Sequence, residues 1–294
     1  MTTFALLLIT GLGLGALYFL IAAGLSLIWG LMRVLNFAHG AFFTVAAYAG
    51  WSVSSRLAAG ASAEVQWIIA VVIAVIVGGV FATLTEVVLI RPLYARHVGQ
   101  VLVTVGLALA TISLVQGGFG SDPKTLQLPA WMTRTTTIVG ANIPNTRLLV
   151  IVIAALVFGL LLFFLRRTRF GLIVRAGVEN RAMVQALGID VHRAFTLVFA
   201  IGGMAAGLAG MLAGTYFGTI DPGRGTSMLL FAFIVVIIGG LGSVTGSALA
   251  AVVVGVLQQF LNFYGAAGVG DFSVVLLLAV VLLVRPGGFS GASQ

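Results

Sequence analysis

The sequence predicts an all-α, polytopic membrane protein, and three observations carry that prediction. Hydrophobic residues make up 61% of the 294 residues, charged residues make up 7%, and the mean hydropathy is +1.20. A soluble domain is normally about 25% charged, so too few polar side chains are present to cover a globule in water. The apolar residues also form long continuous runs, whereas the strands of a membrane β-barrel are short and alternate apolar with polar residues.

The apolar runs predict eight or nine transmembrane helices, because one crossing needs about 20 apolar residues. We interpret the N-terminal run as the first span rather than a cleaved signal peptide, and we treat residues 1–294 as one transmembrane domain. The count is eight if a short piece near Ala41 or Gly239 is re-entrant. The expected spans are 4–30, 41–53, 67–90, 98–116, 148–165, 194–217, two short spans within 228–264, and 272–284.

Glycines recur at helical spacing on one face of the predicted span 194–217, at Gly203, Gly207 and Gly210. Small residues let helix backbones approach closely in lipid, and this approach drives helix association. We therefore interpret the three glycines as a packing face rather than the lining of a substrate path.

Basic residues gather between the apolar runs, as the positive-inside rule describes. For that reason we reject nucleic acid as the explanation of the net charge of +8. Ten of the fifteen basic residues fall on one side of the predicted membrane. This bias places residues 166–193 and the C-terminus in the cytoplasm, and residues 117–147, which hold the only lysine, Lys124, in an outer loop. The ten are Arg33, Arg91, Arg96, Arg166, Arg167, Arg169, Arg175, Arg181, Arg193 and Arg285.

Several kinds of chemistry are missing from the sequence. It has no cysteine, no H-E-x-x-H and no P-loop, because a P-loop needs a lysine after glycine and Lys124 follows Asp122-Pro123. Proton- or sodium-coupled carriers usually need an ionisable group within the membrane. Glu86 is the one candidate, and we interpret it as an interfacial residue that pairs with the basic loop after it. The chain therefore looks like a transport scaffold without its own energy source.

The segment RVLNFAHG, residues 33–40, interrupts two apolar runs with polar side chains. One interpretation is local: Asn36 caps the following helix, and Gly40 eases a tight turn. The other is that Asn36 and His39 line a solvated path, because exposed backbone at membrane depth is tolerated only where it faces protein or water. Spacing alone favours the cap.

A second interruption is GGLGSVTG, residues 239–246, with four glycines in eight residues. Ser243 and Thr245 are expected to bond the carbonyls that the break leaves free. The segment is either a plain tight turn around Gly240 or the second half of a central path. The two interruptions lie in different halves of the chain, which indicates a weak internal duplication.

The third feature is residues 166–193, which hold six of the fifteen basic residues and two of the seven acidic ones. Residues 179–187 are expected to form a short helix with Met183, Val184 and Leu187 on one apolar face. Gly188 is expected to end this helix, and Asp190 to cap the next. The helix either lies on the lipid headgroups or docks into a groove of a cytoplasmic partner.

These residues resemble a known family. GLSLIWGLMRVLNFAHG at 24–40 is similar to the N-terminal signature of branched-chain amino acid ABC transporter permeases. RPL at 91–93, ENRAMVQALGI at 179–189, IGGLGSVTG at 238–246 and LLVRPGGFSG at 282–291 match in the same order. The family also includes permeases for urea and short-chain amides, so the resemblance leaves the substrate open.

The resemblance implies a permease that is no enzyme and lies in a bacterial inner membrane. Its implied partners are a second homologous permease, two ATP-binding cassette subunits and an extracytoplasmic binding protein. ATP and Mg would bind the partner subunits and not this chain. The segment around Glu179, Asn180, Ala186 and Gly188 is similar to the loop that couples such permeases to the ATPase.

The predicted function is inward transport of branched-chain amino acids or a related small polar solute. A self-sufficient carrier or channel for a small neutral solute such as urea, dependent on Glu86 or His39, is the alternative, and a membrane scaffold is a third hypothesis. The predicted coupling residues are Glu179, Asn180, Met183, Ala186, Leu187 and Gly188. The predicted path residues are Asn36, His39, Gly40, Gly240, Ser243 and Thr245.

Overall fold

The computed structural model describes residues 2–57, 60–94, 96–186, 188, 190–266, 268–285 and 287–289. Helix α3 continues without a break into a π-helix, η1 (Thr85–Ile90), and a 3-10 turn, η2 (Arg91–Leu93). The helices are α1 (Thr2–Met32), α2 (His39–Leu57), α3 (Ala63–Leu84), α4 (His97–Phe119), α5 (Ala130–Thr133), α6 (Asn145–Arg167), α7 (Arg169–Ala186), α8 (Val191–Phe217), α9 (Arg224–Gly239), α10 (Val244–Tyr264) and α11 (Val269–Val284). The strands are β1 (Lys124–Thr125), β2 (Thr135–Ile138), β3 (Ala141–Pro144) and β4 (Thr219–Ile220).

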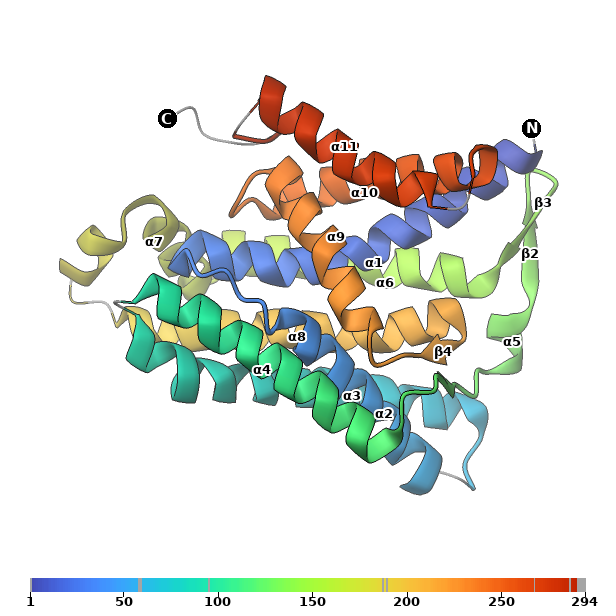
Figure 1. Ribbon diagram of the computed structural model, residues 1–294, viewed down its shortest axis with the longest axis horizontal. Helices are drawn as coiled ribbons and strands as arrows, with labels where there is room; N and C mark the ends of the chain where they lie inside the picture. The colour runs from blue at the N-terminus through green and yellow to red at the C-terminus, as the bar shows by residue number, and fades with distance from the viewer. Residues whose placement is uncertain are drawn as a thin grey trace.

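The long helices lie side by side in one bundle with two distinct ends (Figure 1). Helix α7 projects from one end, which we call the α7 end. The antiparallel pair β2–β3 closes the other end, which we call the ribbon end, and the chain begins there. Helix α1 runs from the ribbon end to the α7 end.

Within the part of the chain that the structure describes, six helices are long and apolar enough to cross a membrane. These are α1, α3 with its π and 3-10 extensions, α4, α6, α8 and α10. The predicted all-α membrane class is therefore confirmed. The prediction of eight or nine spans would add α2 and the two shorter apolar helices, α9 and α11, to this set.

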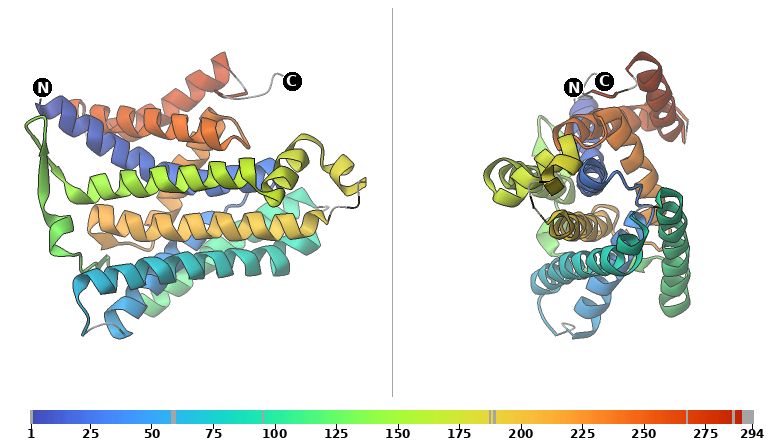
Figure 2. Two further views of the ribbon diagram at one scale, coloured as in Figure 1. Left: turned by 180° about the vertical axis from the view of Figure 1, so that it is seen from behind. Right: turned by 90° about the vertical axis from the view of Figure 1, so that its left-hand side faces the viewer.

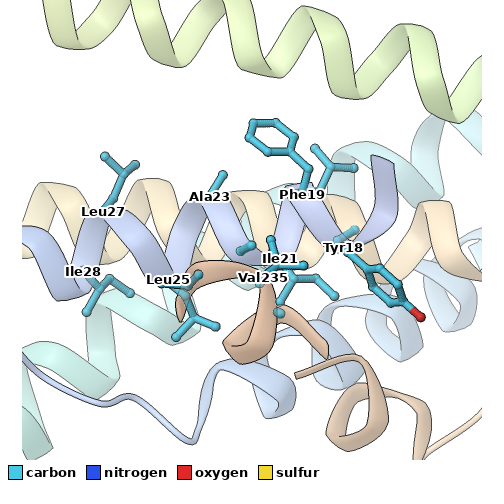
Figure 3. Packing of buried hydrophobic residues seen from close by; sticks show 14 of the residues in the cluster. Tyr18, Phe19, Ile21, Ala23, Leu25, Leu27, Ile28 and Val235 are labelled. Carbon is cyan, nitrogen blue, oxygen red and sulfur yellow. The ribbon is translucent and has the colours of Figure 1, made fainter. Parts of the chain in front are cut away.

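Helix α1 forms the centre of the core and packs against α6, α8, α9 and α10. Its side chains point in several directions: Phe19 reaches toward α6, while Leu25 and Ile28 point away from it (Figure 3). Glycine permits close approach of these helices, since a Cβ atom at Gly11 would lie 2.8 Å from Val256 Cα of α10. The mostly apolar sequence of α1 thus reflects burial around most of its C-terminal two thirds.

The glycines of α8 form the packing face that their spacing predicts. Gly203 and Gly207 lie against α3, and Gly210 lies against the Phe43 carbonyl of α2. A Cβ atom at Gly78 of α3 would lie 3.0 Å from Gly207 Cα, so the two backbones are in van der Waals contact. The packing interpretation is confirmed.

Two features of the bundle ends differ from the predictions. Residues 117–147 are more ordered than a plain loop, because they contain α5 and the β2–β3 pair, and β1 pairs with β4. The helix expected at 179–187 begins ten residues earlier, at Arg169. Thr168 explains this start: its extended backbone ends α6, and its hydroxyl accepts a hydrogen bond from Gly171 N at 2.9 Å, which caps α7.

Candidate functional site

The first interruption of the apolar helices is the segment between α1 and α2. Arg33 has φ of 54°, a left-handed conformation that is uncommon for a residue with a side chain. Asn36 Oδ1 accepts a hydrogen bond from Ala38 N at 3.1 Å. This N–H group lies one residue before α2 and not in its first turn, so the capping role of Asn36 stays a prediction. The Asn36 side chain is nevertheless fully buried, and its Nδ2 atom has no hydrogen-bond partner.

His39, the first residue of α2, is also fully buried. A Cβ atom at Gly24 of α1 would lie 2.9 Å from His39 Cε1 and 2.9 Å from Gly202 Cα of α8, so the imidazole fills a notch between these helices. The Ile21 carbonyl faces the ring, but neither ring nitrogen makes a hydrogen bond of acceptable geometry. Buried polar groups are almost always paired, and so an unpaired imidazole requires an explanation other than stability.

Gly40 has a different role from the predicted tight turn, because it lies inside the first turn of α2. A Cβ atom there would lie 2.6 Å from the Gly225 carbonyl oxygen of α9. Gly40 thus permits a close contact between α2 and α9, and the turn prediction is wrong.

Two serines are also buried without a hydrogen-bond partner, as Asn36 and His39 are. Neither serine was identified from the sequence. Ser26 of α1 and Ser247 of α10 are fully buried, and their hydroxyl oxygens have no partner. Ser26 is a lone serine within an apolar run, and Ser247 directly follows the second interruption; these positions are the only sequence signals for them. We call Ser26, Asn36, His39 and Ser247 the unpaired polar set.

Ser26 also borders a cavity of about 130 Å3 near the α7 end. The cavity lies where α1, α6 and α7 meet the second interruption. Its wall therefore connects Ser26, a member of the unpaired polar set, with helix α7. The lining residues include Gly30, Leu165, Val174, Arg175 and Gly242.

The second interruption, between α9 and α10, satisfies its own hydrogen bonds. Gly240 and Gly242 have φ of 97° and 87°, conformations that favour glycine. Ser243 caps α10 by accepting a hydrogen bond from Gly246 N at 3.0 Å, and its hydroxyl lies 3.2 Å from that of Thr245. The prediction that these hydroxyls bond free carbonyls is wrong, because Phe289 N donates to the Ile238 carbonyl at 2.8 Å instead.

The structure does not place all the predicted path residues in one environment. Asn36 and His39 are buried, whereas Thr245 is exposed and Ser243 is half-buried. The second interruption is a surface turn at the α7 end, onto which the C-terminal residues 288–289 fold.

Helix α7 carries the predicted coupling residues. Met183 is 61% exposed and Ala186 is exposed, whereas Val184 is buried against the bundle. Met183 and Val184 therefore do not share one face, which corrects the prediction. The side chains of Glu179 and Asn180, and the whole of Leu187, lie outside the described residues.

The residues after α7 follow the predictions. Gly188 has φ of 76°, the left-handed conformation expected just beyond a helix. Asp190 caps α8 by accepting a hydrogen bond from His192 N at 3.0 Å. Both predicted backbone roles are therefore confirmed.

Glu86 pairs with Arg91, as the interfacial interpretation predicts, but its side chain is fully buried. Arg91 Nε lies 3.6 Å from Glu86 Oε1, the Thr196 hydroxyl donates to Glu86 Oε2 at 2.8 Å, and the Tyr94 hydroxyl donates to Oε1. Burial and the bond to Glu86 raise the pKa of Tyr94, so this phenol stays protonated as a donor. Among the described residues, no group of three or more His, Asp or Glu side chains is placed to hold a metal ion.

Comparison with known proteins connects this architecture to transport. The family described as "Branched-chain amino acid transport system / permease component" matches residues 7–285. The high-affinity branched-chain amino acid transport system permease protein BraD of Pseudomonas aeruginosa is 30% identical over 98% of this chain and 95% of its own length. The corresponding protein LivH of Salmonella typhimurium is 27% identical over 97% and 94%.

A partial relative has a different printed name. The autoinducer 2 import system permease protein LsrD of Yersinia enterocolitica is 32% identical over 51% of this chain and 45% of its own length. No solved structure matches the chain significantly. The family match extends from within α1 to the residue after α11, and the chain therefore belongs to the permease components of branched-chain amino acid transport systems.

Proposed function

We propose that this chain is the membrane-spanning subunit of a binding-protein-dependent ABC importer and moves branched-chain amino acids, or a related small polar solute, inward. One observation carries the proposal: a chain of this family keeps an unpaired imidazole and an unpaired amide, those of His39 and Asn36, buried among its central helices. Such groups lower stability, and hydrogen bonding to a passing solute would account for them.

The translocation path then runs along the first interruption. Asn36 and His39 supply donors and acceptors, Gly40 keeps α2 against α9, and Ser26 and Ser247 extend the polar positions on α1 and α10. The second interruption, with Gly240, Ser243 and Thr245, lines the inner mouth of this path. Nine crossings, with α2, α9 and α11 as the three shorter ones and two glycine-rich breaks, fit this arrangement.

The inner-membrane orientation places the α7 end and the C-terminus in the cytoplasm. Ten of the fifteen basic residues lie at that end, either within α7 or at the ends of α1, α3, α4, α6, α8 and α11 that meet there. This distribution supports the orientation through the positive-inside rule. The ribbon end then faces the extracytoplasmic binding protein.

Energy is supplied by partner subunits in this proposal. Two ATP-binding cassette subunits hold ATP and Mg, a second homologous permease completes the membrane unit, and helix α7 docks onto the ATPase. The docking residues are Glu179, Asn180, Met183, Ala186, Leu187 and Gly188. The exposure of Met183 and Ala186 supports this role.

The test is solute uptake into proteoliposomes that hold the chain with its neighbouring permease, ATPase and binding-protein gene products. We expect uptake of leucine, isoleucine or valine that requires ATP and stops when the ATPase subunits are left out. Uptake of urea or another neutral solute by the purified chain alone would instead support the carrier or channel alternative. Competition among the three amino acids and urea assigns the substrate.

A further inference from the structure

A polar cluster around the buried Glu86 side chain ties α3 to α8 at the α7 end of the bundle. Glu86 of η1 accepts hydrogen bonds from Thr196 of α8 and from Tyr94, and it pairs with Arg91. Arg91 Nη2 also donates to the Thr196 hydroxyl at 3.2 Å, so Thr196 connects with both members of the ion pair. His192 of α8 stacks on Tyr94 with ring centroids 5.5 Å apart. We call Glu86, Arg91, Tyr94 and Thr196 the Glu86 latch.

The backbone is specialised at this point. Glu86 lies in a π-helix of six residues, and Arg91 N bonds to the Glu86 carbonyl across five residues. Single π turns are rare and occur frequently at functional sites. A fully buried carboxyl group near a membrane interface is also costly unless its partners are well placed. The latch therefore has two features that stability alone does not require.

Glycine contacts continue the α3–α8 junction beyond the latch. Gly78 meets Gly203 and Gly207, and a Cβ atom at Gly79 would lie 2.7 Å from Met204 Cγ. Backbones in such close contact cannot slide past one another without separating, because close-packed interfaces do not deform continuously. The two helices are thus held by the latch at one end and by glycine packing along their length.

Helix α8 also connects α7, which carries the predicted coupling residues, with the notch that holds His39. Its N-cap, Asp190, lies four residues after the end of α7. On its other side, Gly202 lies against Gly24 of α1, at the notch that holds His39. Viewed from the α7 end, α8 lies between α3 and α1 (Figure 2).

We propose that α3 and α8 move as one rigid lever that carries a displacement of α7 to His39, and that Glu86 is the positioning residue that holds the two helices together. The proposal rests on the proposed function, because it assumes that α7 receives the movement of an ATPase. A push on α7 reaches α8 because the two helices are in contact, and the latch makes α3 follow. Without the latch, α8 would move alone and the notch around His39 would change less.

The first test replaces Glu86→Gln in the complete importer, with Glu64→Gln as the matched control. Glu64 is an exposed glutamate in the first turn of the same helix. We expect Glu86→Gln to lower transport by about tenfold, the factor that corresponds to one lost charge-assisted hydrogen bond, while ATP hydrolysis per assembled complex stays near that of the wild type. A parallel fall of both rates, or unchanged transport, would overturn the lever.

The second test staples the two helices. Gly79→Cys with Met204→Cys introduces the only cysteines of the chain, and the close approach of these positions suits a disulfide, whose Cβ atoms lie about 3.8 Å apart. Oxidation should restore transport in the Glu86→Gln background and leave it unchanged in the wild-type background. Loss of transport on oxidation in the wild-type background would show that α3 and α8 must separate, and the lever would be wrong.

Thr196→Val keeps the test valid if Glu86→Gln does not assemble, because it removes the hydroxyl that bonds both Glu86 and Arg91 and leaves the ion pair between them. It should lower transport in the same direction, and the same staple should restore it. Absence of ATP-dependent uptake by the wild type would count against the proposed function and not against the lever.

Discussion

The two interruptions of the apolar helices differ in whether their polar groups are hydrogen-bonded. Residues 240–243 form a surface turn whose glycines adopt positive φ and whose serine caps the next helix, and the Ile238 carbonyl before this turn accepts a hydrogen bond from Phe289 N. Residues 33–38 lead instead to His39 at the start of α2, fully buried and without a hydrogen bond of acceptable geometry. The turn at 240–243 has its hydrogen bonds satisfied without a ligand, whereas the segment that ends at His39 does not.

This difference assigns a functional role to one interruption and a structural role to the other, although the two segments look alike in sequence. A buried polar group that is left unpaired costs about 1–3 kcal/mol, so its presence needs a benefit that appears only when a solute is bound. The turn at 240–243 needs no such benefit. Variants of the unpaired side chains at the first interruption should therefore change transport, whereas variants of the capping serine at the second should change stability.

The largest effect is expected at Gly40, where the first interruption depends on close helix contact. A methyl group in Gly40→Ala would lie 2.6 Å from the Gly225 carbonyl oxygen. Overpacking of this kind costs about 1–3 kcal/mol, and we expect a lower melting temperature together with strongly reduced transport. Gly106→Ala is the matched control, because Gly106 of α4 has open space around it and should tolerate the methyl group. Equal melting temperatures for the two variants would contradict the contact.

The next largest effect is expected at His39, where a substitution should lower transport without lowering stability. His39→Leu removes the unpaired imidazole and keeps much of its volume. We expect transport to fall about tenfold, as for one lost hydrogen bond, with an unchanged or higher melting temperature. His97→Leu, at an exposed position at the start of α4, should change neither quantity. If His39→Leu transports normally, His39 is a structural residue and the comparison between the interruptions fails.

Much of the fold could be predicted from the sequence, because lipid forces apolar runs and helices to coincide. The run predicted at 98–116 is α4, and that at 194–217 lies within α8. Asp190 could be assigned as the cap of α8, because capping depends on residues two or three positions away. Predictions of this local kind succeeded wherever the deciding contact lay nearby in the chain.

Predictions failed where the deciding contact is distant in sequence. Gly40 was expected in a turn, but Gly225 of α9 determines its role. Thr196 lies 110 residues from Glu86, so spacing could not reveal that the carboxyl group is buried in a latch. The unpaired serines, Ser26 and Ser247, could not be distinguished from other serines in apolar runs before their burial was known.

A smaller effect, on stability alone, is expected at the second interruption. Ser243→Ala removes the hydroxyl that accepts from Gly246 N, and the loss of such a cap costs about 1 kcal/mol. We expect a lower melting temperature and normal transport per assembled complex. Ser243→Asp keeps a capping oxygen and should retain most of the stability. A transport defect shared by both variants would assign Ser243 to the path and weaken the contrast with residues 33–38.

The smallest effect is expected at Ser247, and it sharpens the comparison because it concerns a single hydroxyl. Its oxygen is buried without a partner, so Ser247→Ala deletes no hydrogen bond of the protein and should leave stability unchanged or slightly raised. A paired hydroxyl in a similar setting gives the control: Thr215 accepts from Trp67 Nε1 at 2.9 Å, and Thr215→Val should lower the melting temperature. Transport by Ser247→Ala should fall only a few-fold, since a neutral hydrogen bond contributes about 0.5–1.5 kcal/mol. A drop in stability for Ser247→Ala as large as that for Thr215→Val would mean that Ser247 is paired in the membrane, and the unpaired polar set would then lose this member.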